Sequence, residues 1–173
     1  EVNGIAYDYR KVKPGAIYVA IKGYITDGHL YLHQAVEKGA KAVIVEEFVE
    51  ERIPQIKVEN SRVALSKISA NFFHYPSKSM RVIGVTSTNG KTTTTFILDS
   101  IFQKAGYSSG IIGSVINKTG GSIKIADLTT PESYDLQEIF KEMEENKIER
   151  VSMEVSSSAL ELYRTSDIDF DIV

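Results

Sequence analysis

The amino-acid sequence predicts an α/β protein built from two successive units. Short apolar runs such as residues 42–45 are typical of buried parallel strands, and they alternate with segments whose apolar residues recur at helical spacing. Residues 75–79, which contain Pro and Ser, have the composition of a linker. We therefore predict a small α/β domain over residues 1–78 and the first part of a parallel-sheet domain over residues 79–173.

The first unit is predicted to alternate strands and helices. Residues 17–21 follow a Pro-Gly turn and are expected to form a strand. Apolar residues at helical spacing predict a helix that ends at Gly39, and the buried strand at residues 42–45 follows that helix. Residues 56–58 are expected to form another strand, and Ser61 is expected to cap a helix that ends before the linker.

The second unit continues the same alternation. A helix is expected from about Lys91 to Lys104, with Ala105 and Gly106 ending it, and Ser133 or Asp135 can cap a later amphipathic helix. The Gly-Gly pair after Thr119 predicts a hairpin turn. The remaining segments are predicted to be strands: residues 82–85, 111–112 and 150–155.

Residues 82–95 run from an apolar strand through a small polar loop into a hydroxyl-rich helix start. Backbone N–H groups of such a loop and the positive end of the helix converge on one point, which suits a phosphate group. Lys91 can add a positive charge there, and Thr92 can offer a hydroxyl to Mg²⁺. Five residues separate Gly84 from Gly90, one more than the usual pattern, but the strand, loop and helix context still predicts a nucleotide triphosphate site.

Glu154 lies near the carboxyl end of a predicted parallel strand. Ligands of open parallel sheets bind at those ends, so we expect Glu154 to reach the same edge as Lys91 and Thr92 and to contact Mg²⁺ either directly or through another ligand of the ion. The three histidines have no metal-ligand spacing, and we interpret them as solvated or helix-surface groups: His29, His33 and His74.

Composition excludes several classes of partner. The 173 residues carry 20 basic and 23 acidic side chains in a mixed pattern, which offers no surface for nucleic acid or an anionic membrane. No apolar stretch is long enough to cross a membrane, and no export signal is present. With zero cysteines as well, we expect a cytoplasmic protein without disulfides. The start at Glu1 and the strand-like end at residues 169–173 are typical of a fragment.

Several motifs in order resemble the Mur ligases of bacterial cell-wall synthesis, and most closely the members that add the third amino acid to UDP-N-acetylmuramoyl-L-alanyl-D-glutamate. The motifs occupy residues 7–23, 27–29, 86–93, 129–132 and 153–157. The resemblance implies an N-terminal domain for the UDP end of the substrate and part of a central ATP-binding domain. It implies ATP and Mg²⁺ as cofactors, and UDP-N-acetylmuramoyl-dipeptide and a free amino acid, lysine or meso-diaminopimelate, as substrates.

The resemblance also assigns roles to particular residues. ATP would phosphorylate the terminal carboxylate of the substrate, and the amine would attack the acyl phosphate to give an amide. Lys91 and Glu154 would be catalytic, and Thr92 and Glu154 would hold the metal ion. The cofactor-binding residues would be Ser87, Thr88, Asn89, Gly90, Lys91, Thr92 and Thr93. The substrate-binding residues would be Tyr7, Tyr9, Thr129, Thr130, Ser156 and Arg164.

The sequence also departs from the family pattern. Ser87 stands where the first glycine of the loop is usual, so a positive φ there would be strained. Tyr9 and Ser158 replace a usual Ser and His, while Leu128 and Leu162 sit where polar residues are common. We expect that this chain alone does not form the amide bond. Two alternatives stay open: a non-catalytic nucleotide-binding or regulatory module, and another ATP-dependent amide ligase of the folylpolyglutamate or cyanophycin synthetase type.

Overall fold

The computed structural model describes residues 2–24 and 26–173. The chain divides into two compact units, Glu1–Ile68 and Ser69–Val173, and the division falls inside α2 (Ser61–Phe72). Each unit has its own sheet, in agreement with the predicted α/β class. The domain boundary at residue 78 stays a prediction. Within the described residues, no helix combines the length and the apolar character needed to span a membrane.

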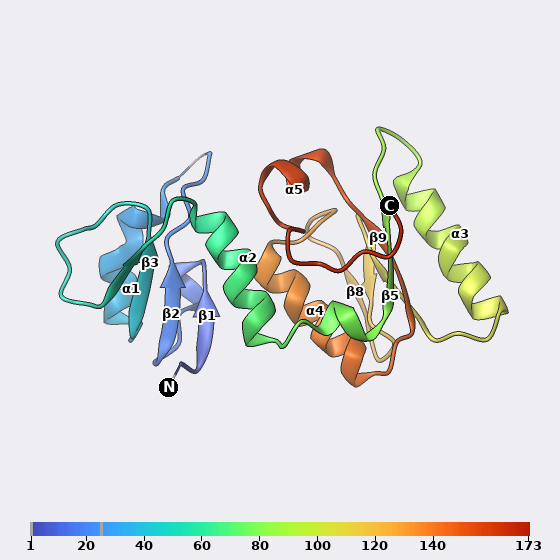
Figure 1. Cartoon of the computed structure of the whole chain (residues 1–173), viewed down its shortest axis with the longest axis horizontal. Helices are drawn as coiled ribbons and strands as arrows, with labels where there is room; N and C mark the ends of the chain where they lie inside the picture. Colours follow the sequence, from blue (N-terminus) through green and yellow to red (C-terminus); the bar gives the residue numbers. More distant parts are fainter. Residues whose placement is uncertain (1, 25) are drawn as a thin grey trace. The chain divides into compact units, whose positions relative to one another are not determined.

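The first unit contains a four-stranded parallel sheet of order β1-β2-β3-β4, visible in blue and teal in Figure 1. Its strands are β1 (Gly4–Ala6), β2 (Ala16–Val19), β3 (Ala42–Val45) and β4 (Gln55–Lys57). The predicted strands are confirmed with shifts of one or two residues at their ends, and β1 was not predicted. The side chains of Tyr18, Val43 and Val45 are buried in the core of this unit, as the apolar runs require.

The helical segments of the first unit differ in detail from the prediction. The segment after residue 28 starts as a 3₁₀ turn, η2 (Gly28–Tyr31), and continues as α1 (Leu32–Glu37), while η1 (Tyr9–Lys11) follows β1. The predicted cap of α2 is wrong. Asn60 Oδ1 accepts the N–H groups of Arg62 and Val63 at 2.9 and 3.1 Å, because Ser61 is already bound to a carboxylate described below.

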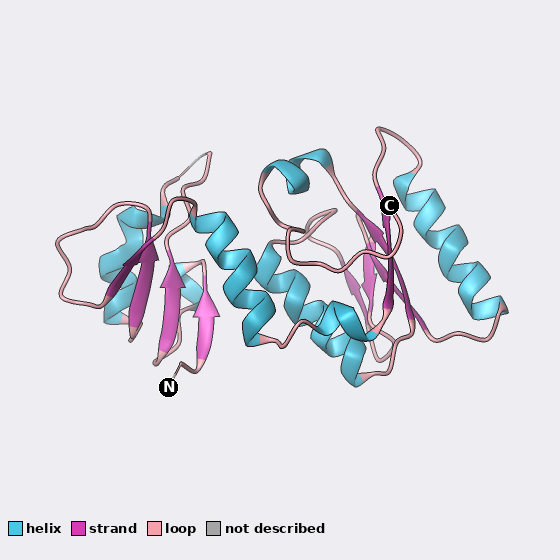
Figure 2. Ribbon diagram, viewed as in Figure 1, coloured by secondary structure: helices cyan, strands magenta, loops and turns pink. Residues whose placement is uncertain are grey.

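The second unit contains a five-stranded mixed sheet of order β5-β9-β6-β7-β8. Its strands are β5 (Arg81–Val85), β6 (Ser109–Ile112), β7 (Ile116–Lys118), β8 (Ile123–Ile125) and β9 (Arg150–Glu154). β5, β9 and β6 are parallel, whereas β7 and β8 form the predicted antiparallel hairpin. The strands are drawn in magenta in Figure 2, where the loop between β5 and α3 extends beyond the strand ends.

Helices α3 (Lys91–Lys104) and α4 (Ser133–Glu145) lie on opposite sides of this sheet (Figure 1). Leu136, Phe140 and Met143 of α4 pack into the core of the unit against apolar residues of β5, β6 and β9. The α3 side is more polar, since Ser152 of β9 donates a hydrogen bond to the Thr95 carbonyl at 3.0 Å. Two short helices complete the unit, namely η3 (Pro76–Ser79) and α5 (Ser157–Glu161).

The start of α4 and the C-terminal segment near residue 172 can both be compared with the sequence-based predictions. Glu132 occupies the N-cap of α4 without a side-chain capping bond, so neither Ser133 nor Asp135 caps this helix as predicted. Near residue 172 the chain pairs in parallel with β5, where Gly84 N–H donates to the Ile172 carbonyl at 2.9 Å. The strand-like character predicted for residues 169–173 is therefore seen as a bridge to the edge of the sheet.

Glu142 ties the β7–β8 hairpin to α4, and we predict that this tie weakens in acid. Hydrogen bonds from Thr119 and Lys124 lower the pKa of Glu142 from 4.5 to about 2. A lowered folded-state pKa gives stability that is present above pH 4.5 and is lost as the pH falls toward 2. We expect Glu142→Gln to lose about 1 kcal/mol of unfolding free energy at pH 7, and progressively less as the pH falls from 4.5 toward 2.

Urea unfolding across this pH range measures the effect. Glu145→Gln on the same helix is the matched control, because the Glu145 side chain is 66% exposed and lies 4.0 Å from Lys141 Nζ. Exposed pairs of this kind contribute little, so this variant should behave like the unmodified chain. A Glu142→Gln effect that does not change with pH would show that the charge of Glu142 is not involved.

Candidate functional site

Three parallel strands of the second unit end at the same edge of the sheet, and each is followed by polar residues. Val85 of β5 pairs with Glu154 of β9, and Ile112 of β6 pairs with Met153 of β9. The loop after β5, the carboxylate of β9 and the turn after β6 are therefore brought together. This is the edge at which parallel sheets bind ligands.

The loop at residues 86–90 is exposed and leads directly into α3. Gly90 has φ 86°, a left-handed conformation that glycine adopts without strain. Lys91 begins the helix, and its Nζ donates a hydrogen bond to the Ser87 carbonyl at 2.7 Å. Ser87 Oγ donates to the Asn89 carbonyl at 2.7 Å. Ser87 does not have a positive φ, so the strain expected from its replacing a glycine is absent.

Glu154 is only 1% exposed, and polar groups from two other segments surround its carboxylate. Thr92 Oγ1 at the start of α3 donates to Oε2 at 3.1 Å. After β6, Ser114 N–H donates to Oε1 at 2.9 Å, and Ser114 Oγ lies 3.0 Å from Oε2. The predicted proximity of Thr92 and Glu154 is thus observed, but Glu154 is a buried, hydrogen-bonded group rather than an exposed charge.

Gly113 and Ser114 were not predicted as site residues. A Cβ built on Gly113 would lie 2.4 Å from Glu154 Oε1, so only glycine allows the backbone to approach the carboxylate this closely. A Gly-Ser pair directly after a buried strand at the carboxyl edge of a parallel sheet is a signal that could have identified them.

Three of the predicted substrate residues of this unit are linked by hydrogen bonds to the Glu154 main chain, to Thr130 or to Ser114, so they are already engaged within the protein. Thr130 is 1% exposed, donates to the Glu154 carbonyl at 2.9 Å and accepts the Ser156 N–H at 3.1 Å. Ser156 caps α5 by accepting the Ala159 N–H at 3.2 Å. Thr129 is half-buried, with its Oγ1 3.0 Å from Ser114 Oγ.

Arg164 is held by two acceptors of its own unit. It pairs with Glu132 at 2.7 Å and donates to the Thr130 carbonyl at 3.0 Å. The side chains of Arg164 and Glu132 are only 14% and 13% exposed. The structure therefore shows Arg164 as a residue that fixes the segment carrying Thr130.

The chemistry of these groups suits a phosphate group and Mg²⁺. Mg²⁺ binds hard oxygen ligands and usually keeps water and substrate phosphates in its shell, so one hydroxyl and one carboxylate suffice from the protein. Thr92 and Glu154 supply these two groups, 3.1 Å apart. The described residues contain no cluster of three His, Asp or Glu side chains that would form a metal cage of its own.

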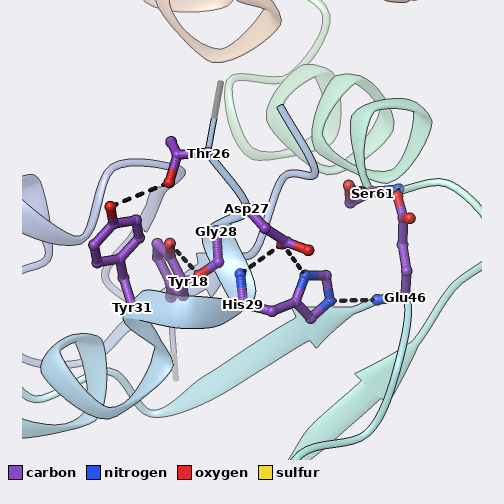
Figure 3. A network of polar contacts seen from close by, with 8 residues as sticks. All are labelled: Tyr18, Thr26, Asp27, Gly28, His29, Tyr31, Glu46 and Ser61. Atoms are coloured by element: carbon purple, nitrogen blue, oxygen red, sulfur yellow. Dashed lines mark hydrogen bonds and ion pairs between the residues drawn. The ribbon is translucent and has the colours of Figure 1, made fainter. Parts of the chain in front are cut away.

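The first unit has a separate polar network at the carboxyl edge of its sheet, shown in Figure 3. Asp27 Oδ1 accepts the His29 N–H at 2.9 Å and lies 2.6 Å from His29 Nδ1. His29 Nε2 accepts the Glu46 N–H at 3.0 Å, and Glu46 Oε1 accepts both the N–H and the hydroxyl of Ser61 at 2.8 Å. Burial alone would raise the pKa of Asp27, but the hydrogen bonds from His29 outweigh it and the pKa is lowered.

This network corrects one sequence-based interpretation. His29 is 13% exposed and internally bonded, so it is not a solvated group, whereas His33 on α1 is 68% exposed as expected. Beside the network lies a pocket of about 110 Å³, lined by Lys22, Asp27, His29, Glu46, Glu47, Phe48 and Val49.

Tyr7 and Tyr9, the predicted substrate residues of this unit, follow β1. The Tyr9 ring stacks on Tyr31 at a centroid distance of 4.7 Å, and Lys11 Nζ lies 6.0 Å from the Tyr7 ring centroid. Tyr31 in turn accepts a hydrogen bond from Thr26 at 3.1 Å (Figure 3).

The structure combines a parallel strand, an exposed loop and a helix that begins at Lys91, an arrangement that suits a phosphate group. Comparison with known families gives two matches. The Mur ligase family catalytic domain matches residues 1–73, and the Mur ligase middle domain matches residues 85–173. The chain belongs to the Mur ligase family.

Two curated relatives of this chain share one name. The UDP-N-acetylmuramoyl-L-alanyl-D-glutamate–2,6-diaminopimelate ligase of Clostridium perfringens is 46% identical over 173 residues, which cover 99% of this chain and 36% of that protein. The enzyme of the same name from Bacillus licheniformis is 42% identical over 172 residues, covering 99% and 35%. This chain thus spans about a third of the length of the curated relatives it matches.

Solved structures show the same fold. A UDP-N-acetylmuramoyl-L-alanyl-D-glutamate–2,6-diaminopimelate ligase superimposes with a TM-score of 0.81 at 24% identity, covering 98% of this chain and 35% of that one. MurF ligase from Thermotoga maritima, solved in complex with ADP, has a TM-score of 0.60 at 26% identity, covering 95% and 33%.

Proposed function

We propose that this chain forms the UDP-substrate and nucleotide-binding portion of an ATP-dependent ligase of peptidoglycan synthesis. The ligase would add the third amino acid to UDP-N-acetylmuramoyl-L-alanyl-D-glutamate. The amino acid named in the relatives, 2,6-diaminopimelate, is the one that we propose in preference to lysine. The observation that carries the proposal is the convergence of Lys91, Thr92 and Glu154 at one sheet edge, in a chain that resembles these ligases over nearly all its length.

The proposed chemistry needs mainly control of charge. The γ-phosphoryl group of ATP passes to the substrate carboxylate with release of ADP, and the amine then displaces phosphate from the acyl phosphate to form the amide. Phosphoryl transfer depends on positioning and on neutralising the phosphate oxygens. Lys91 and the N–H groups of residues 87–93 would bind the phosphates. Mg²⁺, held by Thr92 and Glu154, would supply further positive charge.

The residues near Glu154 and the residues of the first unit would bind different parts of the substrate in this proposal. Thr129 and Ser156 would contact the muramoyl-peptide beside Glu154, while Arg164 and Thr130 would hold that surface in place. The edge formed by Tyr7, Tyr9 and the loop before Asp27 would take the uridine end, where an aromatic ring can stack on a base.

Calorimetric titration of the chain with a non-hydrolysable ATP analogue plus Mg²⁺, and separately with UDP-N-acetylmuramoyl-L-alanyl-D-glutamate, tests the proposal. We expect binding of both ligands. Binding of the nucleotide without the muramoyl-peptide would support the non-catalytic nucleotide-binding module instead. Failure to bind either ligand would overturn both interpretations.

A further inference from the structure

Ser114 is placed to control the orientation of the Glu154 carboxylate. Among the described residues, three donors lie within hydrogen-bond distance of this carboxylate, and two belong to Ser114: its N–H at 2.9 Å from Oε1 and its Oγ at 3.0 Å from Oε2. The third is the Thr92 hydroxyl at 3.1 Å. A buried carboxylate needs such donors, because burial without hydrogen bonds is costly. Ser114 therefore supplies two of these hydrogen bonds and contacts both oxygens of the carboxylate.

The backbone around Ser114 is adapted to this contact. The preceding residue, Gly113, has no side chain, and a Cβ there would meet Glu154 Oε1 at 2.4 Å. β6 and β9 are adjacent parallel strands, so the turn after β6 is anchored directly beside the end of β9. Ser114 itself is exposed, which leaves its hydroxyl accessible from the ligand side.

The hydroxyl of Ser114 also reaches Thr129, with an Oγ to Oγ1 distance of 3.0 Å. One hydroxyl hydrogen serves one acceptor at a time, and a carboxylate is the stronger acceptor. The Ser114 hydroxyl can therefore donate to Glu154 Oε2 or to Thr129 Oγ1, each 3.0 Å away. It lies between the two groups and can bond to either of them.

We propose that Ser114 is a positioning residue that orients Glu154 for Mg²⁺ and links it to Thr129. The part of the site that would bind Mg²⁺ and the nucleotide and the part that would bind the muramoyl-peptide then both depend on the Ser114 hydroxyl. This inference rests on the proposed function. It adds a residue that connects two groups of predicted site residues, those near Thr92 and those near Thr129.

The test compares Ser114→Ala with Ser114→Thr in the full 173-residue chain. Affinity for a fluorescent ATP analogue is measured with Mg²⁺ and with EDTA, and thermal unfolding is followed in parallel. We expect Ser114→Ala to weaken Mg²⁺-dependent binding by about 10-fold, the lower end of the effect of removing a partner that orients a metal ligand. Binding in EDTA should stay close to that of the unmodified chain, and Ser114→Thr, which keeps a hydroxyl, should largely restore the Mg²⁺ effect.

Ser152→Ala is the matched control, because it removes another serine hydroxyl of the same unit. Ser152 is fully buried and donates to the Thr95 carbonyl at 3.0 Å, away from the carboxylate. It should lower thermal stability without changing the ratio of affinities with and without Mg²⁺. A merely structural role of Ser114 would give this same pattern and would contradict the inference.

The link to Thr129 is tested by a double-mutant cycle. Thr129→Val should weaken Mg²⁺-dependent binding in the unmodified background and have little further effect in Ser114→Ala, since coupled neighbours are not additive. Unchanged Mg²⁺ dependence in Ser114→Ala, while the unmodified chain binds the nucleotide with Mg²⁺, would overturn this inference and leave the proposed function standing. Absence of nucleotide binding by the unmodified chain would overturn both.

Discussion

Replacing Lys91 by Ala is expected to weaken nucleotide binding by about 100-fold while leaving the fold intact. Charge-assisted hydrogen bonds contribute roughly 1.5–3 kcal/mol, and about 2.8 kcal/mol corresponds to this factor. The only hydrogen bond or ion pair that the structure gives the Lys91 side chain among the described residues is the 2.7 Å bond to the Ser87 carbonyl, at the start of α3. The loss should therefore appear in binding rather than in stability.

Fluorescence titration with an ATP analogue, together with thermal unfolding, measures this separation. Lys104→Ala is the matched control because it removes the same charge at the other end of α3, in the last turn of the helix. The control should bind the nucleotide like the unmodified chain. If Lys91→Ala bound the nucleotide as tightly as the control, the interpretation of residues 86–93 as a phosphate-binding loop would be wrong.

Replacing Arg164 by Leu is expected to destabilise the second unit by about 3 kcal/mol, because it removes the ion-pair partner of a partly buried carboxylate. Glu132 is 13% exposed and lies 2.7 Å from the Arg164 guanidinium. Arg164 also fixes Thr130 through the carbonyl bond at 3.0 Å. Urea unfolding should show a lower midpoint for this variant, and Glu132→Leu combined with Arg164→Leu should recover part of the loss.

Arg81→Leu is the control for this prediction. Arg81 also pairs with a carboxylate, that of Asp171, but the Arg81 side chain is 69% exposed, so the expected loss is less than about 1 kcal/mol. The outcome distinguishes two roles of Arg164. Normal stability combined with lost binding of the muramoyl-peptide would show that Arg164 acts as a ligand-binding residue and is not mainly structural.

Much of the fold was predictable because its signals are local. The helix from Lys91 to Lys104 was predicted with its observed bounds, since the polar loop and Gly106 mark its two ends. The caps of α2 and α4 were predicted wrongly. Ser61 is a good capping residue in isolation, but it is bound to Glu46, a residue 15 positions earlier in the sequence. A competing long-range acceptor cannot be recognised from the residues near Ser61.

The candidate site likewise contains residues that were predicted from the sequence and residues that were not. The loop with Lys91 and the carboxylate of Glu154 were identified from residue type and from their place at strand ends. Ser114 and Gly113 were missed because their contact with Glu154 joins residues about 40 positions apart and depends on β6 lying next to β9. His29 was misinterpreted for a similar reason, because its Nε2 binds the backbone of Glu46, 17 residues away.

By itself, the sequence determined the α/β class, the order of the elements and the loop that suits a phosphate group. These features depend on the spacing of apolar residues and on turn-forming residues, which act between near neighbours in the chain. Only the tertiary structure decided which polar groups are free and which are already bound. Burial makes an unpaired polar group costly, so Glu154, Arg164 and His29 are each held by partners that folding brings from distant segments.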